Sequence, residues 1–194
     1  AAMNNGSSIT SGSRDGEYTT IVIDSSDQGI ANDSHLYVTG GNADIIIKTD
    51  RLTTSLDGGN LTVGLYNGST IETADGQDTI NMSSTGYVLY QDSHILTGDG
   101  NKYITLHSRS TETVMRDGSS VRTGAGDDTV SLTAGSAGGE VFYDRGVAKY
   151  DAATYAVLME NSFIDSGAGH NVISITSSLP TGINAKDWTG TLWE

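Results

Sequence analysis

The segment Asp117-Gly-Ser-Ser-Val-Arg-Thr-Gly-Ala-Gly-Asp-Asp-Thr-Val-Ser-Leu132 contains a pattern that recurs along most of this 194-residue chain. Four further copies align with it without gaps, and a sixth, at 6–23, carries a small insertion after Gly12. The ungapped copies are 33–47, 68–82, 92–106 and 161–175. Recurrence at spacings of tens of residues is the signature of stacked structural repeats.

The aligned copies have the same kind of residue at corresponding positions. A Ser is followed two residues later by an aliphatic residue, and further aliphatics at a spacing of two follow a Gly turn. The Ser column is Ser7, Ser34, Ser69, Ser93, Ser119 and Ser162, and the aliphatic column after it is Ile9, Leu36, Ile71, Ile95, Val121 and Ile164. A spacing of two indicates β-strands with alternate residues facing inward. We expect the Ser hydroxyls to face inward at a corner and to bond the backbone of the neighbouring coil.

These strands predict an all-β chain forming one right-handed parallel β-helix, or β-solenoid, of about six coils with three short strands per coil. The offsets between copies predict loop insertions near 50–59 and 134–155 of a repeat domain at 1–178. The tail, 179–194, breaks the repeat, and its Trp188 and Trp193 are suited to covering the last coil. The first coil has no visible cap, which predicts an end-to-end or homo-oligomeric contact there.

Composition excludes several classes of function. The chain has 24 Asp and Glu against 10 Lys and Arg, and no basic stripe that could neutralise nucleic-acid phosphates. It has no Cys, so disulfides and thiolate metal sites are excluded, and no apolar run approaches the length of a membrane span. A polar surface rich in Gly, Ser, Thr, Asn and Asp is typical of secreted bacterial repeat proteins. We therefore expect a secreted protein, or one on the bacterial cell surface.

The turn in Thr123-Gly-Ala-Gly-Asp-Asp-Thr-Val-Ser-Leu132 resembles the Gly-x-Gly-x-Asp turns of the calcium-binding RTX repeats of secreted bacterial proteins. In that family each Asp binds Ca²⁺ between successive turns, although nothing in this chain repeats every nine residues. Asp75 and Asp99 share a column and would lie about 4.8 Å apart in neighbouring coils. The resemblance implies a calcium site at Asp75, Asp99, Asn101, Asp127 and Asp128. The alternative is that these side chains cap the turns by bonding backbone N–H groups, with Lys102 neutralising Asp78 and Asp128.

Two sets of residues are candidates for binding a protein or glycan partner. The first is an outward face with Tyr66, Tyr90, Arg116 and Arg122, beside Glu72, Leu96 and Asp165. The second is the longer insertion, with Tyr143, Asp144, Arg145, Tyr150 and Tyr155. Loops on a rigid scaffold often carry recognition, and Tyr and Arg are enriched in binding surfaces.

We therefore expect a binding or structural module, such as an adhesin, a surface-layer protein or a virulence-associated solenoid, in preference to an enzyme. The alternative is a small carbohydrate-active β-helix resembling polysaccharide lyases, hydrolases or epimerases. Such enzymes require two convergent carboxylates, or a base with a cation or Arg. The repeat shows no ladder of paired carboxylates, so no catalytic residue is assigned.

Overall fold

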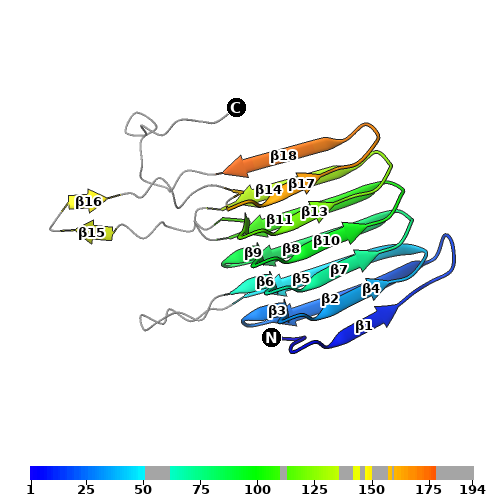
Figure 1. Ribbon diagram of the computed structural model, residues 1–194, viewed down its shortest axis with the longest axis horizontal. Helices are drawn as coiled ribbons and strands as arrows, with labels where there is room; N and C mark the ends of the chain where they lie inside the picture. The colour runs from blue at the N-terminus through cyan, green and yellow to red at the C-terminus, as the bar shows by residue number, and fades with distance from the viewer. Residues whose placement is uncertain are drawn as a thin grey trace.

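The computed structural model describes residues 1–50, 62–109, 113–135, 142–144, 147–149, 157–158 and 160–177. These residues are all β, with most strands stacked in three parallel sheets, and the described part contains no helix (Figure 1). Accordingly, the described residues include no helix long and apolar enough to cross a membrane.

The three parallel sheets each take one strand from successive copies of the repeat. Sheet A has the order β12 (Met115–Arg116), β9 (Tyr87–Tyr90), β6 (Val63–Tyr66) and β3 (Gln28–Ala31). Sheet B has the order β1 (Ser8–Ser11), β4 (His35–Val38), β7 (Thr70–Thr73), β10 (His94–Thr97), β13 (Ser120–Arg122) and β17 (Phe163–Asp165). Sheet C has the order β18 (Val172–Ser177), β14 (Thr129–Ala134), β11 (Lys102–Ser108), β8 (Asp78–Ser84), β5 (Asn42–Thr49) and β2 (Tyr18–Ser25).

The register between neighbouring strands confirms the alignment of the repeats. In sheet B, Ile71 pairs with Leu36 on one side and with Ile95 on the other, and Ile95 pairs with Val121. Sheet C has the same arrangement, with Ile80 between Ile45 and Ile104. Identical columns arise because a residue in one coil lies directly beside its counterpart in the next. The predicted stacking of parallel strands is therefore correct.

The core is a set of aliphatic columns between the three sheets. Leu65, Ile71, Leu89 and Ile95 are fully buried, as are the corresponding residues of sheet C in the middle coils. Each such side chain contributes about 1.5–3 kcal/mol when fully covered. In the end strands the columns open, with exposed fractions of 40% for Ile9 and 50% for Ile175. Apolar burial therefore depends on having a coil on both sides.

The Ser column lies at the corner between sheets A and B, and its hydroxyls form hydrogen bonds both within a coil and between coils. Ser69 and Ser93 are buried, as expected. Their hydroxyls donate to the carbonyl oxygens of Tyr66 and Tyr90, three residues earlier in the same coil, at 2.7 and 2.8 Å. The Ser69 hydroxyl oxygen also accepts the backbone N–H of Ser34 in the neighbouring coil at 3.4 Å, as predicted. The two residues before each Ser adopt left-handed backbone conformations, which turn the chain so sharply that the hydroxyl reaches its own coil.

The Gly turn between sheets B and C has a steric cause. A Cβ atom on Gly100 would lie 2.4 Å from the carbonyl oxygen of Gly76, and one on Gly126 would lie 2.5 Å from that of Gly100. Both glycines also have positive φ, at 99° and 156°. Only glycine allows the turns of neighbouring coils to stack this closely.

The longer insertion contains a short antiparallel hairpin formed by β15 (Phe142–Asp144) and β16 (Val147–Lys149). Its direction of pairing differs from that of the stacked strands. The predicted insertion at 50–59 and the predicted cap at 179–194 fall outside the described residues, apart from Asp50.

Candidate functional site

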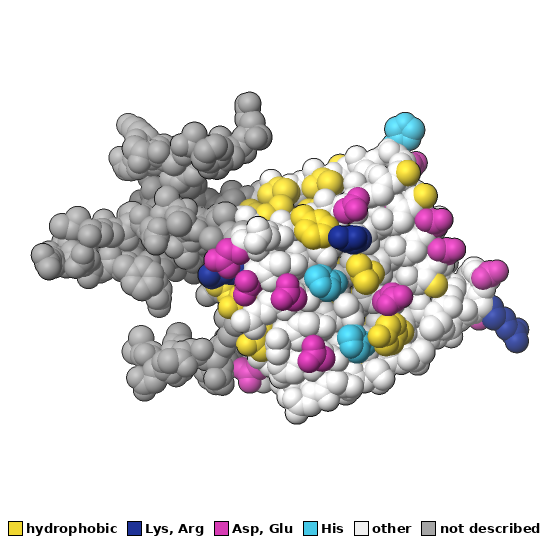
Figure 2. All heavy atoms as spheres, viewed as in Figure 1, with side chains coloured by type: hydrophobic (Ala, Val, Ile, Leu, Met, Phe, Trp, Pro, Cys, Tyr) yellow, Lys and Arg dark blue, Asp and Glu magenta, His cyan; other side chains and the backbone are white. Residues whose placement is uncertain are grey.

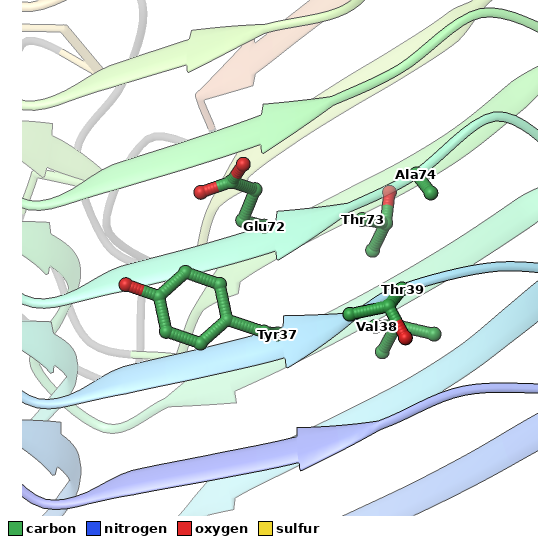
Figure 3. Close-up of a pocket in the computed structure, with 6 residues that line it drawn as sticks. All are labelled: Tyr37, Val38, Thr39, Glu72, Thr73 and Ala74. Carbon is green, nitrogen blue, oxygen red and sulfur yellow. The ribbon is translucent and has the colours of Figure 1, made fainter.

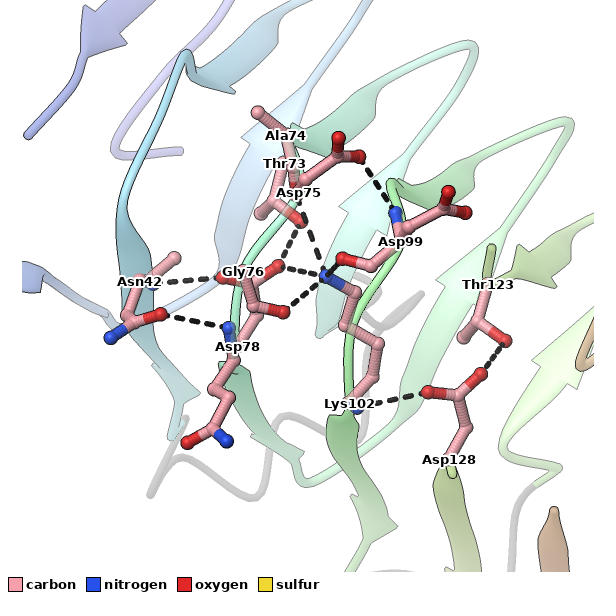
Figure 4. A network of polar contacts seen from close by, with 12 residues as sticks. Asn42, Thr73, Ala74, Asp75, Gly76, Asp78, Asp99, Lys102, Thr123 and Asp128 are labelled. Atoms are coloured by element: carbon pink, nitrogen blue, oxygen red, sulfur yellow. Dashed lines mark hydrogen bonds and ion pairs between the residues drawn. The ribbon is translucent and has the colours of Figure 1, made fainter. Parts of the chain in front are cut away.

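The turn carboxylates predicted to bind calcium are hydrogen-bonded from coil to coil. Asp75 Oδ1 accepts the backbone N–H of Asp99 at 2.8 Å (Figure 4), and Asp99 Oδ1 accepts that of Ala125 at 2.8 Å. In a second row, Asn101 Oδ1 accepts the N–H of Asp127 at 3.0 Å, and Asp127 Oδ1 accepts that of His170. These side chains cap N–H groups of the adjacent coil, whereas the alternative to calcium had expected bonds to N–H groups of their own turn.

Asp128 is separated from the other predicted metal ligands because it faces the interior and is only 1% exposed. Its Oδ1 accepts the N–H of Lys102 at 2.9 Å, and its Oδ2 accepts the Thr123 hydroxyl at 2.5 Å. No three His, Cys, Asp or Glu side chains gather within the described residues. Calcium binding by the exposed turn residues stays a prediction.

The most buried charge in the described part of the chain is Lys102, in the same column. Its ammonium donates to Asp78 Oδ2 at 2.8 Å, and to the carbonyl oxygens of Gly76 and Asp99 at 2.8 and 2.9 Å (Figure 4). The Lys102 side chain is fully buried and that of Asp78 is 1% exposed. The alternation of charge along this column predicted the pairing with Asp78 correctly. Lys102 does not form an ion pair with Asp128.

An aromatic group projects from sheet A at the corner before sheet B, and we call it the tyrosine platform: Tyr66, Tyr87, Tyr90, Arg116 and Glu160. The rings of Tyr66 and Tyr90 stack with centroids 5.7 Å apart, and those of Tyr87 and Tyr90 are 4.8 Å apart. Burial raises the pKa of Tyr90 above its usual 10.0, so its phenol is neutral at physiological pH. The sequence columns predicted the adjacency of Tyr66, Tyr90 and Arg116.

Arg116 is held in the platform by directional hydrogen bonds. Its Nε and Nη2 donate to the two carboxylate oxygens of Glu160, both at 2.8 Å, and its Nη1 donates to the Tyr87 hydroxyl at 3.0 Å. These hydrogen bonds raise the pKa of Arg116 and lower that of Glu160. Tyr87 and Glu160 were not predicted. Glu160 lies just before the last copy of the repeat and 44 residues after Arg116 in the chain, so the aligned columns did not indicate this contact.

The outer face of sheet B contains the other predicted residues of this surface. Arg122 lies over the ring of Phe163, with its guanidinium carbon 4.9 Å from the centroid, in a cation–π contact. Glu72 and Asp165 are exposed and Leu96 is half-buried. Figure 2 shows acidic, apolar and histidine side chains interspersed on this side of the molecule.

The two histidines of this face occupy one column, two strands apart, as the alignment predicted. His94 Nδ1 lies 2.9 Å from the Ser120 hydroxyl, and His35 Nδ1 bonds the Thr70 hydroxyl. Burial lowers the pKa of His94 below its usual 6.5, and Arg122 lowers it further, while Asp92 acts in the opposite direction.

The predicted binding residues of the longer insertion are only partly within the described chain. Tyr143 and Asp144 belong to β15 and pair with Ala148 and Val147 across the hairpin. Arg145, Tyr150 and Tyr155 lie outside the described residues, so their part in binding stays a prediction.

Replacing Lys102 tests the buried ion pair. Lys102→Met keeps the apolar stem but leaves the Asp78 carboxylate buried without its cation, which should lower the free energy of unfolding by about 3–5 kcal/mol. The double variant Lys102→Met/Asp78→Asn should regain part of this loss, because it removes the unpaired charge. Urea unfolding measures both, with Lys48→Met, an exposed lysine of β5, as the control. A loss below about 1 kcal/mol for Lys102→Met would contradict the description.

The depressed pKa of His94 predicts a dependence of stability on pH. The unfolded chain protonates this ring at a higher pH than the folded chain does. The free energy of unfolding should therefore decrease as the pH falls below about 6.5, until the pH passes the native pKa. His94→Gln should remove this component of the slope in urea unfolding series. His170→Gln, at a fully exposed side chain, should leave it in place; equal slopes for wild type and His94→Gln would refute the assignment.

The described geometry thus contains a capped turn row, a buried ion pair, the tyrosine platform and a mixed outer face on sheet B. No protein-family model, curated protein or solved structure matches the chain. The function must therefore be inferred from the residues and contacts described above.

Proposed function

We propose that this protein is a secreted or surface-exposed bacterial binding module, in which a right-handed β-solenoid of six coils serves as a rigid scaffold. Six-stranded sheets B and C support the number of coils. The strong preference of parallel strand connections for one hand supports the right-handed assignment. Turns joined by side-chain hydrogen bonds and a filled core give such a scaffold little freedom to deform.

The tyrosine platform is the observation that carries this proposal. The rings of Tyr66 and Tyr90 are stacked and that of Tyr87 is tilted against Tyr90, and all three are half-buried, so their positions are set before a ligand arrives. Arg116 is held beside them by Glu160 and Tyr87. Rigid aromatic rings with a fixed arginine lose little entropy on binding, and residues of this kind dominate the energetics of many interfaces.

The ligand classes that fit the platform are a neutral glycan and a protein surface. A sugar ring can lie against a tyrosine ring while its hydroxyls bond the polar rim. A polyanion is disfavoured by the formal net charge of −14. The longer insertion, with Tyr143, Asp144, Arg145, Tyr150 and Tyr155, remains the second proposed contact surface, and Ca²⁺ at the exposed turn carboxylates remains a proposed stabiliser.

Binding to a panel of neutral and uronate oligosaccharides, measured by calorimetry, tests the proposal. Tyr90→Ala should weaken binding of any oligosaccharide ligand by about tenfold or more, because the variant removes the central ring of the platform. Tyr103→Ala, an exposed tyrosine of sheet C, is the matched control and should bind like wild type. Thermal unfolding with and without a calcium chelator tests the proposed calcium site. A lower melting temperature in chelator supports calcium binding, and an unchanged melting temperature contradicts it.

Two results would overturn the proposal. Reproducible cleavage or epimerisation of an oligosaccharide would favour the carbohydrate-active alternative. Ligand binding that is unchanged in Tyr90→Ala would show that the platform is not the binding surface.

A further inference from the structure

A shallow pocket lies on the outer face of sheet B, away from the tyrosine platform. It has a volume of about 240 Å³ and is lined by residues at the C-terminal ends of β4 and β7 and just after them (Figure 3). Its lining residues are Tyr37, Val38, Thr39, Glu72, Thr73 and Ala74. Pockets for small-molecule ligands usually measure about 300–1,000 Å³. The pocket on sheet B is therefore of a size for one amino-acid side chain.

One wall of the pocket is an aromatic ring in a fixed orientation. Tyr37 stacks on His35 with ring centroids 5.6 Å apart, and His35 is itself bonded to the hydroxyl of Thr70. The stack restrains the Tyr37 ring on the face of the sheet. A tyrosine ring held in this way attracts a cation placed over its face.

The opposite wall supplies a negative charge. Glu72 is the register partner of Tyr37 on the adjacent strand, and its exposed side chain extends over the same part of the face (Figure 3). No other described residue forms an ion pair with Glu72. Ala74, just after the end of β7, provides apolar surface beside these groups, whereas Val38 points into the core and is 3% exposed.

The charge around the pocket has one predominant sign. Exposed aspartates flank sheet B on both edges: Asp33, Asp92 and Asp117 at the corner before its strands, and Asp75, Asp99 and Asp127 at the turn after them. Among the described strands of sheet B, Arg122 is the sole Lys or Arg. Such a face attracts a basic partner over the range of the Debye length.

We propose that this pocket binds a lysine or arginine side chain from a basic segment of a partner protein. The methylene stem lies along Ala74, and the cationic head lies between the Glu72 carboxylate and the Tyr37 ring. The exposed aspartates at the two edges of sheet B attract the rest of the basic segment to the outer face of the sheet. This inference rests on the proposed binding function and specifies the chemistry of a protein partner at a second site.

Titration of the isotope-labelled full chain with hexalysine, followed by amide NMR shifts at low salt, tests the inference. Shifts should concentrate on β4 and β7. Glu72→Gln should weaken binding by about fivefold, and Tyr37→Leu by about threefold, while Asp24→Asn should change it by less than about twofold. Asp24 is an exposed carboxylate of β2 on sheet C, so this control removes the same charge from another face.

Equal hexalysine affinity for wild type and Glu72→Gln would overturn the inference, as would shifts confined to other faces. Binding of a neutral oligosaccharide at β4 and β7 in place of hexalysine would also overturn it. These outcomes are independent of the proposed function, because oligosaccharide binding and its loss in Tyr90→Ala are measured at the tyrosine platform. If oligosaccharide binding at the tyrosine platform failed while hexalysine still bound at β4 and β7, the inference about the pocket on sheet B would still hold.

Discussion

The in-register hydrogen bonding of parallel strands between neighbouring coils is the constraint on which the structure depends. Because Ile71 lies directly between Leu36 and Ile95, a residue at one position must fit beside its counterparts in both adjacent coils. The same constraint requires glycine at Gly100 and Gly126, where a Cβ would collide with the backbone of the neighbouring coil. Register, core and turns therefore have one common cause.

Stacking also explains how polar groups are tolerated in the interior. An inward column of like carboxylates would be costly at the spacing between strands, and in the described coils Lys102 interrupts such a column between Asp78 and Asp128. The ammonium donates to Asp78 and to three turn carbonyls, those of Ala74, Gly76 and Asp99. Outside the core, Asp75 and Asp99 use one oxygen each to join their turn to the next. Buried and exposed charges thus both contribute to the contact between coils.

The stacked fold and its columns were predictable from the sequence because in-register stacking places equivalent residues side by side. The aligned columns also predicted correctly that Tyr66, Tyr90 and Arg116 lie next to one another. Contacts that depend on the length and rotamer of a side chain could not be predicted from the aligned columns. Glu160 forms an ion pair with Arg116, and the Ser93 hydroxyl donates to the carbonyl oxygen of Tyr90 in its own coil. Both contacts depend on side-chain rotamers and on the geometry of the corner, which the aligned columns do not show. The pocket beside Tyr37 escaped prediction for the same reason, since it depends on the relative positions of side chains on two strands.

Cysteine cross-linking of the cysteine-free chain tests the inter-coil register most directly. Asn81 and Thr105 are exposed register partners on sheet C, whereas Thr79 is offset from Thr105 by two residues. Disulfide geometry tolerates Cα atoms about 4.4–6.8 Å apart, and a two-residue offset puts them about 8 Å apart. Asn81→Cys/Thr105→Cys should therefore oxidise readily under native conditions, and Thr79→Cys/Thr105→Cys should not. Preferential oxidation of the offset pair would contradict the stacked register.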